Sequence, residues 1–170
     1  MSARDPGGRF DVPFERRSII KGTTEELVRT VGQEITWWRW DATATQVDDV
    51  YDVGSIDGGR VWHPGVSVPT VNTVIMQGVT LQDVRGFYNT DVLRCTLNMD
   101  VVERFFGTMP TSTDDYLRDR ITFRNQVFRP THFYPRGLIT DKYTLFTLDA
   151  TQINPEELVN DQQFLNYISE

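Results

Sequence analysis

The sequence predicts a mainly β fold: a small β-barrel or sandwich with one or two short helices and extended N- and C-terminal arms. Aromatic residues make up 12% of the chain, and such side chains suit the pleated surface of a sheet. Several short segments alternate apolar and polar residues, and turn residues separate them at fairly regular spacing. With 170 residues and 39% hydrophobic content, we expect one domain at 23–152, an N-terminal arm at 1–22 and a C-terminal tail at 153–170.

Two segments near the N-terminus predict a short helix and a strand. The stretch TTEELVRTVGQE has Thr23 as a candidate cap and Glu26 three residues later, which is typical of a helix start. In EITWWRWDA, Trp37 alternates with Trp38 and Trp40. Because neighbouring side chains of a strand point to opposite faces, this pattern predicts a strand with large rings on both faces.

The segment DVLRCTLNM is the clearest predicted strand, since every second residue is apolar. Its inward positions are Leu93, Cys95, Leu97 and Met99. The following DVVERFFG predicts one short helix that is capped by Asp100 and ends at Gly107.

The segment from 119 to 150 predicts three or four further strands. Ile121 and Phe123 share one face, a turn follows at 124–126, and a strand returns over 127–133. Another alternating strand covers 142–148. The final NPEELVNDQQFLNYISE has an Asn-Pro helix start and predicts either a terminal helix or an apolar, acidic tail.

The net charge of −7 argues against a general nucleic-acid binder, which needs a basic face. No apolar run is long enough to span a bilayer, and the N-terminus lacks the apolar core of a secretory signal, so we expect no membrane partner. Cys95 is the only cysteine and predicts a reducing compartment. Fifteen arginines against two lysines favour an interface protein, because Arg is enriched and Lys depleted at protein contacts.

No arrangement of residues in the sequence predicts an active site. His63, His132 and Cys95 are too few for a zinc site, and the serines lack a nucleophile motif. Acidic pairs are more simply turns and helix starts; they are Asp48-Asp49, Asp114-Asp115 and Glu156-Glu157. We therefore expect neither an enzyme nor a cofactor. A small hydrolase using these carboxylates and a carbohydrate-binding module using the tryptophans stay as alternatives.

The segment 119–150 resembles the C-terminal hairpin of head-to-tail stopper proteins, also called head-completion proteins, of long-tailed bacteriophages. The resemblance rests on Asp119-Arg120-Ile121-x-Phe123, a turn, Val127-Phe128, a prolyl loop, Gly137, Tyr143 and alternating Leu145 and Leu148. The upstream DDVYDVGS and GRVWHPG also resemble a phage neck protein. Asn125-Gln126 stands where the family has a turn glycine, and the match covers about 36–150.

This resemblance implies a β-barrel that assembles as a homo-oligomeric ring, six- or twelve-fold, in the neck of a virion, after synthesis in the bacterial cytoplasm. The implied partners are a portal adaptor, a tail terminator or tail-completion protein and, without sequence preference, the packaged DNA end. The ring would close the DNA-filled head and offer the platform for tail attachment. Another connector ring, an adaptor or a tail terminator, is the nearest alternative.

Two sets of residues are candidates for this role. The subunit-interface candidates are Phe10, Phe14, Arg118, Arg120, Arg124, Arg129, Arg136, Phe164 and Tyr167. The candidates for a loop facing the lumen, or gating it, are Asp48, Asp49, Asp52, Asp57, Asp83 and Arg85. For the arginines a solvated strand face and DNA contact remain open, and for the termini unstructured tails remain an alternative to docking straps.

Overall fold

The computed structural model describes residues 24–30, 32–45, 59–83, 86–107, 114–138, 143–159 and 161–167, together with Phe14, Ser18 and Gly22. Within these ranges, the side chains of 79–83, 86–89 and 115 lie outside the description.

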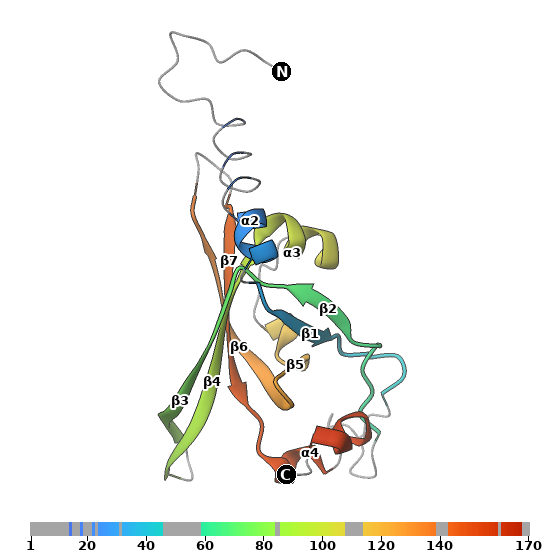
Figure 1. Ribbon diagram of the computed structural model, residues 1–170. Helices are drawn as coiled ribbons and strands as arrows, with labels where there is room; N and C mark the ends of the chain where they lie inside the picture. The colour runs from blue at the N-terminus through green and yellow to red at the C-terminus, as the bar shows by residue number, and fades with distance from the viewer. Residues whose placement is uncertain are drawn as a thin grey trace, which may run out of the picture.

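Seven antiparallel strands form one sheet in the order β2-β1-β5-β6-β7-β4-β3 (Figure 1). The strands are β1 (Glu34–Trp38), β2 (Val66–Pro69), β3 (Asn72–Asp83), β4 (Gly86–Asn98), β5 (Arg120–Phe123), β6 (Gln126–Arg136) and β7 (Leu145–Gln152). The helical segments are α2 (Glu25–Thr30), α3 (Met99–Phe106), η2 (Asp114–Tyr116), α4 (Pro155–Leu158) and η3 (Gln162–Tyr167). The predicted mainly β fold is confirmed.

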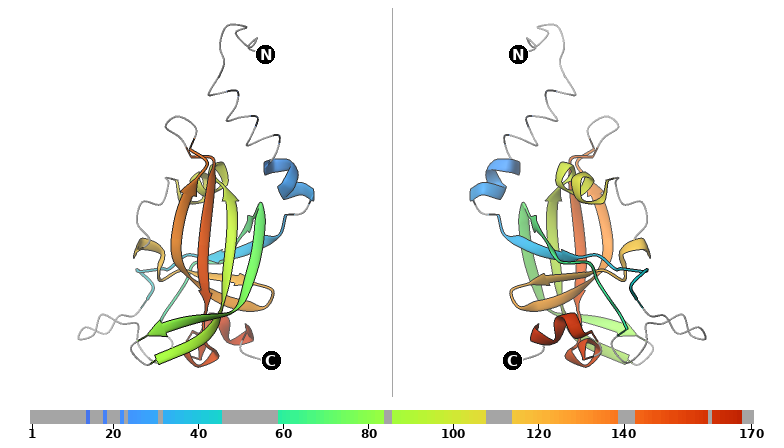
Figure 2. Two further views of the ribbon diagram at one scale, coloured as in Figure 1. Left: turned by 90° about the vertical axis from the view of Figure 1, so that its left-hand side faces the viewer. Right: turned by 90° about the vertical axis from the view of Figure 1, so that its right-hand side faces the viewer.

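Strand β6 belongs to both halves of the sheet. Its first residues pair with β5, and the strand from Phe128 onward pairs with β7. One extra residue, Thr131, interrupts the β6–β7 register between Pro130 and His132, and a bulge of this kind bends a strand. As a result β1, β2 and β5 cross over β3, β4 and β7 as a second layer (Figure 2), an arrangement typical of small sandwiches and barrels.

A two-residue link joins the two edges of the sheet. β2 and β3 are the outermost strands, yet only Thr70 and Val71 separate them in the chain. The Thr70 N–H donates to Gln33 O beside β1 at 2.9 Å, and the Val71 N–H donates to Thr96 O of β4 at 2.8 Å. The link therefore connects the two layers directly and closes one end of the sandwich.

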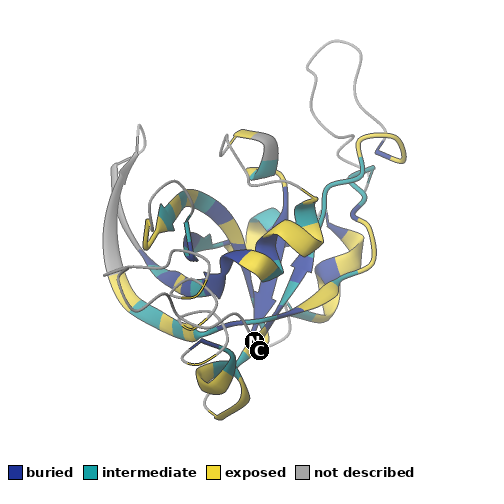
Figure 3. Ribbon diagram, turned by 90° about the horizontal axis from the view of Figure 1, so that it is seen from above, coloured by how far each residue is buried: buried dark blue, intermediate teal, exposed yellow. Residues whose placement is uncertain are grey.

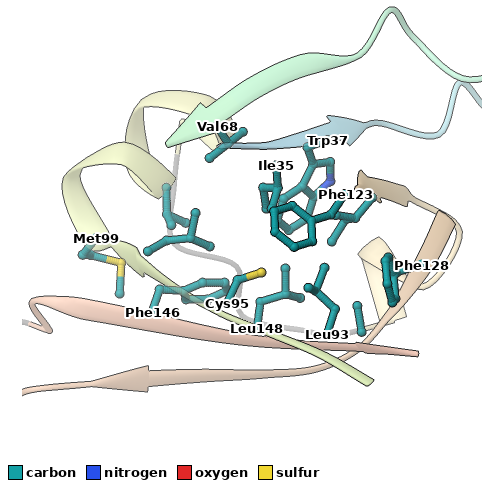
Figure 4. Close-up of a cluster of buried hydrophobic side chains, with 14 residues drawn as sticks. Ile35, Trp37, Val68, Leu93, Cys95, Met99, Phe123, Phe128, Phe146 and Leu148 are labelled. Atoms are coloured by element: carbon teal, nitrogen blue, oxygen red, sulfur yellow. The ribbon is translucent and has the colours of Figure 1, made fainter. Parts of the chain in front are cut away.

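The main core lies between the two layers, where alternation along each strand places apolar side chains on one face. Ile35 and Trp37 come from β1, and Leu93, Cys95 and Leu148 face them from β4 and β7 (Figure 4). Seen from above, the buried positions concentrate between the layers and the exposed positions lie outside (Figure 3). Leu93, Cys95 and Leu97 are thus confirmed as inward residues of β4, whereas Met99 is buried but is the first residue of α3.

A second cluster lies on the opposite face of β1, as the alternating tryptophans predicted. Trp38 and Trp40 pack there against Trp62 and Phe164, while Trp37 belongs to the main core. The layer formed by β1 and β5 is therefore covered on both faces, by β4 and β7 on one side and by the C-terminal segment on the other.

Helix α3 begins two residues earlier than predicted. Its cap is Asn98, whose side chain accepts a hydrogen bond from the Asp100 N–H, so Asp100 lies inside the first turn. The end is as predicted: Gly107 has a φ of 75° and its N–H donates to Glu103 O, a conformation that favours glycine. In the described part of the chain, no helix is long and apolar enough to cross a membrane.

The β5–β6 turn consists of two residues that both have positive φ, 47° for Arg124 and 63° for Asn125. Phe123 and Gln126 pair directly across it. Two positive φ angles define the type I′ hairpin turn, which matches the twist of the strands and prefers Asn followed by Gly. The turn forms here without glycine, because Asn tolerates this conformation better than most residues.

Replacing Asn125 with Gly should raise the free energy of unfolding by about 0.5 kcal/mol, because Gly adopts a positive φ without strain at this turn position. Asn72→Gly is the matched control: Asn72 is also exposed, but it lies in β3, where Gly should cost roughly 0.5–1 kcal/mol. Urea unfolding measures both. A loss of stability in Asn125→Gly would contradict the assigned turn.

Candidate interaction surfaces

The arginines predicted for subunit contact do not form one patch. Arg129 and Arg136 are seven residues apart on β6, about 23 Å along a strand. Arg124 lies in the β5–β6 turn. Arg118 precedes β5, and its guanidinium carbon is 5.7 Å from the ring centroid of Trp40. The exposed arginines therefore serve separate parts of the surface.

Asp119 is a buried carboxylate that connects β5 to β1. Its Oδ2 accepts a hydrogen bond from Trp37 Nε1 at 2.8 Å, and its Oδ1 accepts one from the Trp40 N–H at 2.8 Å. Arg39 Nε lies 3.3 Å from Oδ2. Buried carboxylates are stable only with such partners, so Asp119 fixes the path of β1 as it leaves the sheet.

Arg39 extends this contact toward α3. Its guanidinium carbon is 4.9 Å from the ring centroid of Phe106 and 4.9 Å from that of Tyr116, and the two rings contact each other edge to face. A cation between aromatic faces is attracted to both. Arg39 thereby ties the end of α3 to η2, the elements on either side of 108–113.

Arg120 is buried within the protomer, in contrast to its predicted role at a subunit interface. Arg120 Nη2 lies 3.6 Å from Asp161 Oδ2 and 3.8 Å from Glu157 Oε1. Asp161 is also paired with Arg60, whose Nε lies 2.7 Å from Oδ1. Arg129 Nη1 contacts the same Glu157 oxygen at 3.5 Å. Arg120 therefore holds the C-terminal segment of its own chain. It is not part of an exposed surface that could contact another subunit.

Burial disfavours the charged forms of both Asp161 and Arg120 in this network. Desolvation raises the pKa of Asp161, and the nearby positive charges of Arg120 and Arg60 oppose the rise. Desolvation also lowers the pKa of Arg120, against the attraction of Asp161 and Glu157. The same burial raises the pKa of Asp119. These carboxylates are thus held at a cost in solvation.

The C-terminal segment packs on the β-sandwich. Gln163 binds the backbone of Trp62 twice: Oε1 accepts from the Trp62 N–H at 2.7 Å, and Nε2 donates to Trp62 O at 3.0 Å. The Phe164 ring is fully buried and meets Trp38 and Trp62 edge to face, with centroids 5.2 and 5.1 Å apart. Phe164 is therefore a core residue here, while Tyr167 beside it stays half-buried.

Most of the predicted lumen residues lie outside the described residues, namely Asp48, Asp49, Asp52, Asp57 and Arg85. Asp83 is the last residue of β3 and pairs with Gly86. The predicted loop around Asp83 is thus the end of a two-stranded ribbon in which β3 and β4 run past the last β4–β7 pair, Val92 with Thr151. Phe10 is also outside the described residues, and Phe14 is 46% exposed.

The outer face of β6, β7, β4 and β3 carries an exposed patch of five residues, which we call the outer-face patch. Its members are Val74, Arg94, His132, Tyr134 and Arg136. The His132 and Tyr134 rings are stacked at 5.9 Å and 9°, and the Arg136 guanidinium carbon is 6.0 Å from the Tyr134 centroid. Arg94 donates two hydrogen bonds of 2.7 Å to Asp149. Among the described elements, none covers this face (Figure 2).

Helix α2 is a second unpartnered element. It has six residues, none of them buried, and Leu27 is 41% exposed. Glu25 and Glu26 make its first turn acidic. Its N-terminal neighbour is fixed, because Asn98 Nδ2 donates to the buried Thr24 hydroxyl at 3.2 Å. The sequence identified the helix but did not indicate that its side chains would stay unburied among the described residues.

The described residues offer little for metal or glycan chemistry. No group of three or more His, Cys, Asp or Glu gathers in this part of the chain. Burial raises the pKa of the Cys95 thiol to about 12, which makes it unreactive. Trp40 and Trp62 meet edge to face at 78°, whereas sugar stacking needs a flat exposed ring.

Comparison with known proteins gives structural similarity without a sequence match. No protein-family model matches the chain, and no curated protein matches it in sequence. Among solved structures, a chain from the "Virion of native gene transfer agent (GTA) particle" aligns with a TM-score of 0.39 and 9% identity, over 71% of this chain and 94% of that one. At this level of similarity the match says nothing about what the present chain binds.

Arg120→Met should lower the free energy of unfolding at neutral pH by about 3 kcal/mol, because it leaves the buried Asp161 carboxylate without one of its two cations. The double variant Arg120→Met/Asp161→Asn should lose less than the sum of the two single losses, since it removes both buried charges. Glu156→Gln, on the exposed side of α4, is the control and should be neutral. Urea unfolding measures the series; additive losses would contradict a coupled pair.

The pH dependence of stability tests the same carboxylate. Because the folded pKa of Asp161 is raised, the folded chain binds its proton more tightly than the unfolded chain does. The stability that Asp161 contributes is therefore greatest below its ordinary pKa of 3.8 and falls as the pH rises through the raised value. The stability difference between the wild type and Asp161→Asn should shrink from acid to neutral pH. A growing difference would mean that ion pairing outweighs desolvation.

Proposed function

We propose that the chain is a structural protein of a phage-type virion, a head-to-tail stopper that forms a ring below the portal and its adaptor. The observation that carries this proposal is the pair of unlike, unpartnered surfaces on one protomer, the outer-face patch and helix α2. A subunit of a closed ring needs two different lateral surfaces, because each copy contacts its neighbours head to tail.

The hairpin that resembles stopper proteins supports the proposal through its role in the protomer. In Asp119-Arg120-Ile121, Asp119 binds β1, Arg120 binds the C-terminal segment and Ile121 enters the main core. The motif thus holds three parts of the chain in fixed positions. A ring that bears the pressure of packaged DNA and the load of a tail requires subunits of constant shape.

In this role the ring closes the filled head and presents a platform for a tail terminator or tail-completion protein. Its place is the neck of the virion, and contact with the DNA end is non-specific. We expect no catalytic activity and no cofactor. An adaptor or tail-terminator ring is the alternative within the same class. The buried and edge-to-face tryptophans do not favour a carbohydrate-binding module.

The proposal is tested with the full-length chain, alone and with purified portal and adaptor. Light scattering and negative-stain imaging should find closed rings of six or twelve copies, alone or on the portal–adaptor complex. Virions assembled without the chain should show heads that lose DNA and lack tails. The proposed role would be refuted if the chain stayed monomeric and bound neither portal nor adaptor. It would also be refuted if particles without the chain were DNA-filled and carried tails.

A further inference from the structure

Among the described residues, helix α2 buries none of its side chains against the rest of the protomer. An isolated helix of six residues is not stable in water, because too few hydrogen bonds offset the cost of nucleation. Short helices in proteins persist by packing an apolar side against the rest of the fold. Here none of the six side chains is buried: Leu27 is exposed and Val28 is half-buried. In the described part of the chain, the Thr24–Asn98 hydrogen bond places the start of the helix, while its own side chains stay unburied.

The outer-face patch has the composition of a contact surface. Tyr, Arg and His dominate it, and Tyr and Arg are the residues that contribute most to protein–protein binding. Val74 is 46% exposed and Tyr134 38% exposed. His132, Asp149, Arg94 and Val74 lie in one row across four strands. The stacked rings and the Arg94–Asp149 pair hold these side chains in place before any partner arrives.

The two surfaces are complementary. Glu25 and Glu26 of α2 carry negative charge next to an apolar Leu27. Arg136 supplies an exposed positive charge next to an apolar Tyr134 ring. Acidic and basic groups would then surround an apolar centre, as in typical interfaces. The protomer does not make this contact itself, since its own α2 does not lie over the outer face (Figure 2).

We infer, on the basis of the proposed ring, that α2 of one copy docks on the outer-face patch of the next copy. The contact joins two different surfaces, so it repeats head to tail from copy to copy. It closes into a ring when the rotation between neighbouring copies is a whole fraction of a full turn. Leu27 lies against Tyr134 of the neighbour, and Glu25 and Glu26 face Arg136.

Cysteine crosslinking tests this contact. Leu27→Cys/Tyr134→Cys, treated with a short bis-maleimide, should give a ladder of covalent oligomers on a denaturing gel, because crosslinks within one copy leave a monomer band. The native Cys95 is buried and its pKa is raised to about 12, so it does not contribute. The matched control is Leu165→Cys/Tyr134→Cys: Leu165 is 45% exposed but lies in η3, and this pair should give no ladder.

Charge reversal gives a second readout that does not depend on crosslinker geometry. Glu25→Arg/Glu26→Arg should weaken ring assembly about tenfold, as should Arg136→Glu, and the combined variant should recover most of the loss. Melting temperatures verify that each variant is folded. If rings form but the double-cysteine variant gives no ladder and the charge reversals do not change assembly, the inferred contact is wrong while the proposed function stands. A ladder that stops at two copies would overturn the head-to-tail contact. A wild-type chain that never assembles would refute both.

Discussion

The structure depends on two adjacent residues whose side chains bind different parts of the chain: Asp119, just before β5, and Arg120, the first residue of β5. Asp119 accepts hydrogen bonds from Trp37 and Trp40 on one side, and Arg120 pairs with Asp161 on the other. Each is a buried charge, and a buried charge is tolerated only where its partners are fixed. The partners lie far from β5 in the chain, so this one dipeptide determines how distant segments assemble around a short strand.

A consequence is that the C-terminal segment acts as a third layer of the domain. Arg60 and Trp62 contact Asp161, Gln163 and Phe164, so the segment that follows 46–58 is held by the C-terminus. Trp40 pairs with Trp62 and fixes the other side of the same region. The described residues on either side of 46–58, the stretch that holds Asp48, Asp49, Asp52 and Asp57, are therefore fixed against each other and against the C-terminal segment.

The sequence predicted the features that repeat locally. Alternation gave the inward residues of β4 and the two faces of β1, and Gly107 gave the end of α3. It did not predict that Arg120 and Phe164 are buried, because arginine and a terminal phenylalanine are read as surface residues until their partners are known. Asp161 lies 41 residues from Arg120 in the chain, and no local pattern reveals such a pair. The sequence also did not identify Asn98 as the cap of α3, because Asp100 is an equally good capping residue.

Part of the arginine content serves the protomer itself and not a subunit contact. Arg39, Arg60 and Arg120, three of the fifteen arginines, contact aromatic rings or carboxylates of their own chain. Composition alone therefore cannot identify the subunit contact. What identifies a contact surface is geometry: a helix too short to be stable without packing, and a four-stranded face that no described element covers. Arg136 belongs to that face, and it differs from Arg120 because no carboxylate of the described protomer neutralises it.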